Sequence, residues 1–290
     1  KTLPGYMELN LEFDSPANHR KIPTSIWLPP EYLTHEDASF PVHLSYMIFH
    51  GLYSALAGQM AAHPTILVSY SVSLKDPSKS GSYPWIDSWG TESSHPQLKM
   101  ETFLFDELYP YLKENFRIFD KVAATGFSRG GYMAFLYMLE RPDLFASVCS
   151  LEPRNFSAGY GGTMSVHIRN GGEGQAWLDA RSLPLLVTSH VADKHKLPPM
   201  FTIVGYRDYL LGDNRRWAKL VTDLNLDIAQ ELSSGMSREP GTQGPATEAV
   251  NRSETFLEQY RERSVDFRYM EVDGTHEATG YTFSQAMEFH

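Results

Sequence analysis

A serine, an aspartate and a histidine that could together activate a hydroxyl group follow one another along this 290-residue chain. The serine is Ser128, at the centre of residues 126–130, which fit the pattern G-x-S-x-G. A serine hydroxyl is a weak nucleophile until a histidine accepts its proton, and that histidine needs a carboxylate to fix its tautomer. The pattern therefore predicts Ser128 as a nucleophile if the fold brings a histidine and a carboxylate to it.

The segments on either side of Ser128 favour a strand, a sharp turn and a helix. Residues 121–125 form a short and mostly apolar segment. Residues 131–140 are strong helix formers, and the expected helix ends before Pro142. On such a turn the serine is exposed at the top of the sheet, and the flanking glycines allow a strained backbone and close packing. This context favours a nucleophile elbow over an ordinary βα turn.

The histidine and the acid are sought by chain order, because in α/β-hydrolases the acid follows the serine and the histidine comes last. His276 fits, since it lies in the loop after the last expected strand, residues 265–272. His190 and His195 precede the strand that should carry the acid, and His290 is terminal and expected to be mobile. The sequence therefore predicts His276 as the general base.

The acid is expected at the end of residues 200–205, which form an apolar strand ending in glycine. Asp208 follows this strand and is the first candidate. Asp213 is the second, although its place before a helix fits a capping role, and Asp193 and Asp273 remain further alternatives.

An oxyanion intermediate also needs backbone donors. The N–H of Arg129, directly after the nucleophile, is one expected donor, and the N–H of Leu52, in the loop after an early strand, is the other. His50 is expected to brace that loop. Trp85 and Trp89 could stack on a sugar or an aromatic acyl group, or could simply pack their own loop.

Composition limits the partners and the class of protein. The chain is 42% hydrophobic, which supplies a sizeable core, and its formal charge of −10 argues against nucleic acid or an anionic membrane as the main partner. No apolar run reaches the roughly 18 residues that a membrane span needs. The single cysteine, Cys149, excludes an internal disulfide, offers no metal-site spacing and is expected in the core.

Strand-like and helix-like segments alternate, which is typical of an α/β fold with a mostly parallel sheet covered by helices on both faces. We expect one domain over residues 1–290, with excursions at about 157–184 and 228–264. The expected strands are residues 25–28, 42–49, 65–72, 122–127, 146–151, 200–204 and 265–272. The expected helices include residues 97–116, with a kink at Pro110, residues 215–224 and residues 248–263.

Several short motifs keep the order of a known family. They are residues 26–32, 50–51, 101–111, 126–131, 141–145, 205–208 with 214–215, and 274–276. With them the chain resembles the putative-esterase family of α/β-hydrolases, which contains feruloyl and acetyl-xylan esterases, S-formylglutathione hydrolases, siderophore esterases and mycolyltransferases. The resemblance implies Ser128 as nucleophile, His276 as base and Asp208 as acid.

The resemblance implies a serine carboxylic-ester hydrolase that needs no metal or organic cofactor. It points to a small-molecule or polysaccharide ester as substrate, with an acetyl or feruloyl ester of a carbohydrate as the expected example. An acyltransferase with the same triad and a non-catalytic binding protein are the alternatives. The sequence leaves the compartment open, although the start at Lys1 and the secreted enzymes of the family favour an extracellular location.

Overall fold

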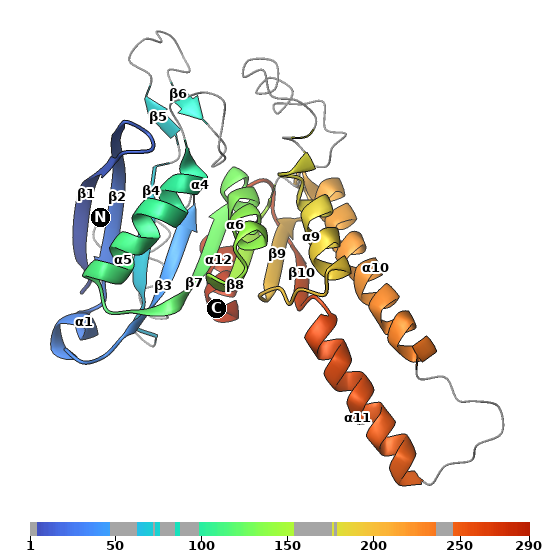
Figure 1. Ribbon diagram of the computed structural model, residues 1–290. Coiled ribbons are helices and arrows are strands. Elements are labelled where there is room, and N and C mark those ends of the chain that lie inside the picture. Colours follow the sequence, from blue (N-terminus) through green and yellow to red (C-terminus); the bar gives the residue numbers. More distant parts are fainter. Residues whose placement is uncertain are drawn as a thin grey trace.

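The computed structural model describes residues 5–46, 63–71, 73–75, 85–87, 99–153, 176, 179–235 and 246–290. Within these residues one sheet of eight strands runs through the molecule, with helices on both of its faces (Figure 1). The expected α/β-hydrolase fold, with a mostly parallel central sheet, is confirmed.

The sheet has the strand order β1-β2-β4-β3-β7-β8-β9-β10. The strands are β1 (Met7–Ser15), β2 (Arg20–Leu28), β3 (Phe40–Tyr46), β4 (Ile66–Tyr70), β7 (Ile118–Phe127), β8 (Phe145–Leu151), β9 (Met200–Gly205) and β10 (Phe267–Val272). β1 and β2 pair antiparallel, β2 also pairs antiparallel with β4, and all pairs from β4 to β10 are parallel. A separate antiparallel pair joins β5 (Ser73–Lys75) and β6 (Trp85–Asp87).

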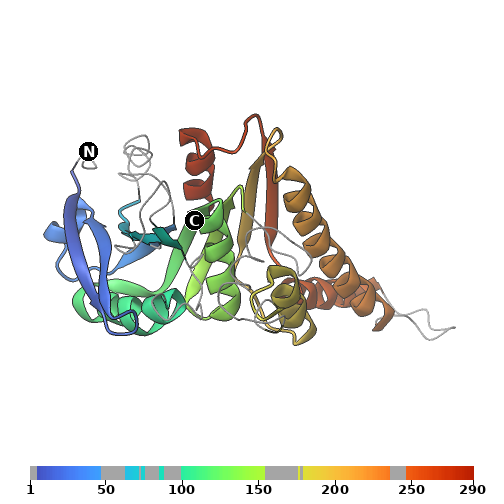
Figure 2. The same cartoon turned by 90° about the horizontal axis from the view of Figure 1, so that it is seen from above.

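The helices form two layers around this sheet. They are α1 (Pro30–Thr34), α4 (Met100–Thr102), the π-helical η2 (Phe103–Leu108), α5 (Tyr109–Asn115), α6 (Arg129–Glu140), α9 (Leu183–Ala192), α10 (Leu211–Gly235), α11 (Ala246–Arg263) and α12 (Gly280–Phe289). Figure 2 shows α5, α6 and α9 on one face and α12 on the other. In the described part of the chain, no helix combines the length and apolar character that a membrane crossing requires.

The parallel strands end in register, and we call the side of the sheet on which their carboxyl ends lie the functional edge. Gly126 of β7 lies beside Ser150 of β8, Leu151 of β8 lies beside Ile203 of β9, and Gly205 of β9 lies beside Val272 of β10. The carboxyl ends of β7 to β10 therefore finish at one edge, as is typical of sites in open α/β sheets. Residues that directly follow these four strands are brought together even where they are far apart in sequence.

The core explains why the central elements form where they do. The residues of α6 from Gly130 to Leu139 are all buried, so this helix is enclosed between the sheet and its neighbours. The short apolar strands β4, β8 and β9 are buried on both faces, which is the pattern expected of covered parallel strands. Cys149 lies in β8 and is buried, as predicted for a core thiol.

Each of the seven expected strand segments contains a strand, but several other elements differ from expectation. β1 and α9 were not expected. The helix expected at residues 97–116 runs without a break through α4, η2 and α5, and Pro110 lies inside it, directly after the π-helical η2. Proline removes one N–H donor from a helix interior, and the change from π-helical to α-helical hydrogen bonding falls at this position. α10 extends well beyond the expected residues 215–224. Its additional turns are held by Ile228 and Leu232, which continue the buried stripe of the helix.

The two expected excursions have different outcomes. The segment from 228 to 264 contains the end of α10 and all of α11, two helices that lie side by side and extend away from the sheet in Figure 1. The expected helix at residues 248–263 is confirmed as α11. Most of the glycine-rich excursion at 157–184 lies outside the described residues, and only its end enters α9.

The end of α12 corrects the expectation of a mobile His290. Both of its ring nitrogens are held, with Nε2 at 2.8 Å from the Thr125 hydroxyl and Nδ1 at 2.7 Å from the Ser147 hydroxyl. His43 completes this cluster, because its Nε2 lies 2.9 Å from the same Thr125 oxygen. Two imidazoles that meet at one hydroxyl beneath α12 fix this helix to β7 and β8.

The buried His43 predicts acid sensitivity of the fold. Burial lowers the pKa of His43 to about 3, below that of a histidine in the unfolded chain. Between about pH 6.5 and pH 3 the unfolded chain therefore binds a proton that the folded chain does not, so stability is full above this window and falls with pH inside it. We expect His43→Gln to reduce the slope of the unfolding free energy between pH 6 and 4.5 by up to about 1.4 kcal/mol per pH unit.

Urea unfolding of both proteins at several pH values measures this slope. The exposed His63 supplies the matched variant, His63→Gln, which should leave the slope as it is in the original protein. Equal slopes for the original protein and His43→Gln would contradict a neutral His43 in the folded state.

Candidate active site

Ser128 stands on the turn between β7 and α6, where the backbone is forced into an unusual conformation. Its φ is 54° and its ψ is −113°, in a region that residues with a side chain rarely adopt. Such a residue costs about 1–3 kcal/mol and persists only where its surroundings impose it. Here the Ser128 N–H donates to the carbonyl of Leu151 in β8 at 2.8 Å, which anchors the turn to the neighbouring strand.

Two glycines allow α6 to approach the sheet at this turn. A Cβ at Gly126 would lie 1.9 Å from the carbonyl oxygen of Gly130, and a Cβ at Gly130 would lie 2.2 Å from the carbonyl oxygen of Tyr46. Neither contact is possible for a real side chain, so the turn requires glycine at both positions. The close packing that the motif predicted for its flanking glycines is confirmed.

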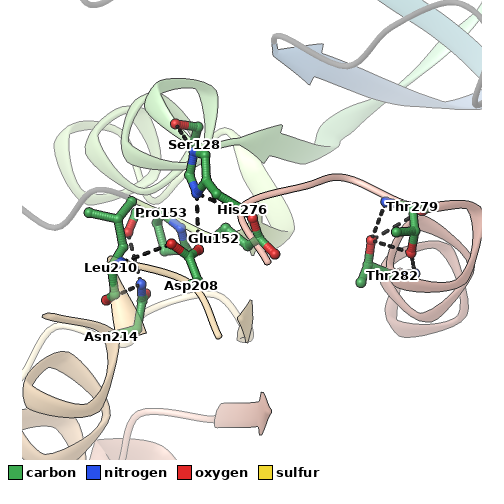
Figure 3. A network of polar contacts seen from close by, with 9 residues as sticks. All are labelled: Ser128, Glu152, Pro153, Asp208, Leu210, Asn214, His276, Thr279 and Thr282. Atoms are coloured by element: carbon green, nitrogen blue, oxygen red, sulfur yellow. Dashed lines mark hydrogen bonds and ion pairs between the residues drawn. The ribbon is translucent and has the colours of Figure 1, made fainter. Parts of the chain in front are cut away.

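His276 links the nucleophile to an acid. Its Nε2 lies 2.9 Å from Ser128 Oγ, and its Nδ1 lies 3.0 Å from Asp208 Oδ2 (Figure 3). An ionised Asp208 can only accept, so this geometry fits a neutral imidazole that donates from Nδ1 and accepts the serine proton at Nε2. The structure thus brings together all three residues that chain order selected as the triad.

Asp208 is held rigidly in the turn after β9. It is 5% exposed, its Oδ1 accepts the N–H of Leu210 at 2.8 Å, and its own N–H donates to the carbonyl of Gly205 at 2.9 Å. A buried carboxylate with a fixed donor on one oxygen presents the other oxygen in one direction. That direction is toward His276.

The alternative acids and bases are engaged elsewhere. Asp213 lies in the first turn of α10 and pairs with Arg216, so it is not the residue before the helix that a capping role required. Asp273 pairs with Arg207 at 2.6 Å. His190 lies 2.6 Å from the carbonyl of Leu139 through its Nε2.

Glu152 is a site residue that the sequence analysis missed. It is the first residue after β8, is 2% exposed, and its Oε2 lies 3.3 Å from His276 Nδ1. Burial, followed by the charge of Asp208, raises the pKa of Glu152 to about 8. Its position directly after a strand of the functional edge, the rule that selected Asp208, was a signal that could have identified it.

The remaining predicted site residues are placed only in part. Arg129 is the first residue of α6, so its N–H belongs to the first turn of the helix that follows Ser128. Trp85 lies in β6 opposite Lys75 of β5. Leu52, His50 and Trp89 lie outside the described residues.

Possible metal-ligating atoms gather at one place in the described ranges. One oxygen each of Glu152 and Asp208 and one nitrogen of His276 lie within 4.8 Å of one another. An Nδ1 that donates a proton to a carboxylate has no lone pair to offer a metal, and Nε2 faces Ser128. The cluster therefore fits the acid end of a proton-transfer chain better than a metal site.

The strained backbone predicts that Ser128→Gly is more stable than Ser128→Ala. Both changes remove the hydroxyl and its contact with His276, but only glycine relieves the positive φ. After the entropy cost of glycine in the unfolded chain, we expect the glycine variant to exceed the alanine variant by about 0.5–2 kcal/mol. Denaturant unfolding measures the difference, and an alanine variant at least as stable as the glycine variant would contradict strain at the elbow.

Comparison with known proteins places the chain in a family. The family model described as putative esterase matches residues 15–288, which is most of the chain. A search of the curated proteins finds no match.

Solved structures share the fold at low sequence identity. The chain resembles a ferulic acid esterase (16% identity, TM-score 0.61, covering 98% of this chain and 96% of that one). It also resembles an S-formylglutathione hydrolase from Agrobacterium tumefaciens (15% identity, TM-score 0.62, covering 100% of this chain and 95% of that one). A third similar structure is a fluorophosphonate-binding serine hydrolase from Staphylococcus aureus (16% identity, TM-score 0.60, covering 98% of this chain and 97% of that one). The chain therefore belongs to the putative-esterase family of α/β-hydrolases and is a carboxylic ester hydrolase.

Proposed function

We propose that the chain hydrolyses carboxylic esters through an acyl-enzyme formed on Ser128, with His276 as general base and Asp208 as the acid that orients it. The observation that carries this proposal is the continuous contact from Ser128 Oγ through both ring nitrogens of His276 to Asp208 Oδ2, at 2.9 and 3.0 Å. Three different loops contribute these groups to one sheet edge, which is the arrangement that the reaction requires.

The geometry supports a two-step reaction. His276 Nε2 accepts the Ser128 proton as Oγ bonds to the ester carbonyl carbon, and the imidazolium then gives that proton to the leaving alcohol. A water molecule, activated by the same nitrogen, attacks the acyl-enzyme and releases the acid. Asp208 holds the Nδ1 proton throughout and stabilises the imidazolium. We assign the oxyanion to the N–H groups of Arg129 and Leu52.

We further propose an acetyl or feruloyl ester of a carbohydrate as the substrate. Support comes from Tyr209, which is 69% exposed while its ring centroid lies 4.7 Å from that of His276. A large exposed aromatic ring beside the catalytic base offers a stacking surface for a sugar or an aromatic acyl group. One structural relative is described as a ferulic acid esterase and others as S-formylglutathione hydrolases, so both ester types belong in the test.

The proposed nucleophile is tested by hydrolysis of p-nitrophenyl acetate. We expect Ser128→Ala to lower kcat by roughly 10³-fold or more, because the covalent step has no other nucleophile. Ser25→Ala, on β2 away from the sheet edge that carries the site, is the matched control and should retain activity. Comparable activity in the two variants would refute Ser128 as the nucleophile.

The substrate class is tested with Tyr209→Ala on methyl ferulate, feruloylated xylan, acetylated xylan and S-formylglutathione. We expect KM for the feruloyl esters to rise roughly 5- to 50-fold, which corresponds to the loss of one aromatic contact, with kcat less affected. Tyr281→Ala removes a comparably exposed tyrosine, 60% exposed on α12, and serves as the control. Efficient turnover of S-formylglutathione alone would overturn the carbohydrate part of the proposal.

A further inference from the structure

Glu152 is held at the active site by a constrained backbone. It follows β8 directly, and its φ of 49° lies in the left-handed region that a glutamate rarely occupies. Its N–H donates to the carbonyl of Ile203 in β9 at 2.7 Å, which fixes this conformation. The side chain is thereby turned into the site rather than outward, and Figure 3 shows it beside Asp208 and below His276. A strained, buried acid at this position needs a physical explanation.

The Glu152 carboxyl group faces two partners. Its Oε2 lies 3.3 Å from His276 Nδ1 without making a hydrogen bond to it, and one carboxylate oxygen of Glu152 lies within 4.8 Å of one carboxylate oxygen of Asp208. Two ionised carboxylates at this separation repel each other, whereas a protonated one can donate to the other. Asp208 is already fixed as an acceptor of Nδ1–H and of the Leu210 N–H. The shared proton therefore belongs on Glu152.

The groups around Glu152 are consistent with a proton on its carboxyl group. The titratable side chains that act on it among the described residues are Asp208, from the turn after β9, and His276, from the loop after β10. Backbone N–H groups of Glu277 and Gly205 also reach its carboxyl group and partly offset the burial. Burial and the Asp208 charge dominate, so the pKa of Glu152 rises to about 8 and it carries a proton at neutral pH.

We propose that Glu152 is a second positioning acid of the active site: it shares one proton with Asp208 and turns Oε2 toward His276 Nδ1, so that both carboxyl groups hold the imidazole. The inference rests on the proposed function of Ser128 and His276. During attack the serine proton moves to Nε2, and the carboxyl pair keeps its single proton and single negative charge. When the Asp208 carboxylate is removed, Glu152 releases its proton to solvent and accepts Nδ1–H in its place.

A mutant cycle tests this role with p-nitrophenyl acetate as substrate, using Asp208→Ala, Glu152→Gln and the double variant. We expect Asp208→Ala to lose about 10- to 100-fold in kcat, less than the roughly 10⁴-fold loss usual for a triad acid, because Glu152 takes its place. The double variant should reach the full loss of roughly 10⁴-fold. Glu152→Gln alone should cost only several-fold, since the amide can still donate to Asp208.

The matched control uses the other buried acid near the site. Asp213 pairs with Arg216 and does not contact His276, so Asp208→Ala/Asp213→Asn should behave like Asp208→Ala. If Asp208→Ala alone shows the full loss and Glu152→Gln adds nothing, Glu152 is not a second acid. Ser128→Ala separates the two proposals, because near-original activity in that variant would refute the triad itself.

A pH profile supplies a readout that a merely structural role would not change, and it needs only the isosteric Glu152→Gln variant. Loss of the shared proton near pH 8 places a second negative charge beside Nδ1 and makes His276 a stronger base. We expect kcat/KM of the original protein to rise by a second, several-fold step around pH 8, and this step to be absent from Glu152→Gln. Superimposable profiles for the two proteins would overturn the proposal.

Discussion

The common register of four parallel strands is the constraint on which the site depends. β7, β8, β9 and β10 are paired so that their carboxyl ends finish together. Ser128 and Glu152 directly follow β7 and β8, while Asp208 and His276 lie in the loops after β9 and β10. Neighbouring strands stand about 5 Å apart, and the loop after β10 reaches back across the strand ends, so that Ser128 and His276, which are 148 positions apart, meet within hydrogen-bond distance. The pairing of the strands thus determines which positions of the chain meet at the site.

The packing of α6 against the sheet imposes the strained backbone conformation of Ser128. α6 is buried along almost its whole length and can approach β7 and β3 only because Gly126 and Gly130 carry no side chain. The turn between strand and helix is then too sharp for an ordinary backbone conformation, and Ser128 adopts a positive φ. Burial of the helix offsets the local cost of roughly 1–3 kcal/mol, and the hydroxyl is presented at the sheet edge. On the opposite face, α12, which follows the loop that carries His276, is fixed to β7 and β8 by the histidine cluster.

Chain order and strand ends were enough to predict the fold and to select Ser128, Asp208 and His276, because each stands after an apolar segment of recognisable strand character. The sequence did not indicate that Glu152 would be turned inward, since that depends on a backbone bond to β9 that no local pattern encodes. β1 was missed although its alternating polar and apolar residues are typical of an edge strand. α9 is apolar around most of its circumference and follows a glycine-rich segment, so helical periodicity could not reveal it. The roles of Leu52 and Trp89 stay predictions.

The central claim is that His276 activates Ser128, and covalent capture of the serine tests it most directly. The protein would be incubated with a fluorophosphonate probe, weighed intact and digested to locate the adduct, beside a folded His276→Gln variant. A single adduct on Ser128, formed at least roughly 10³-fold more slowly in His276→Gln, is the result that the account predicts. No adduct on the folded protein, an adduct on another residue, or equal labelling of the two proteins would contradict it.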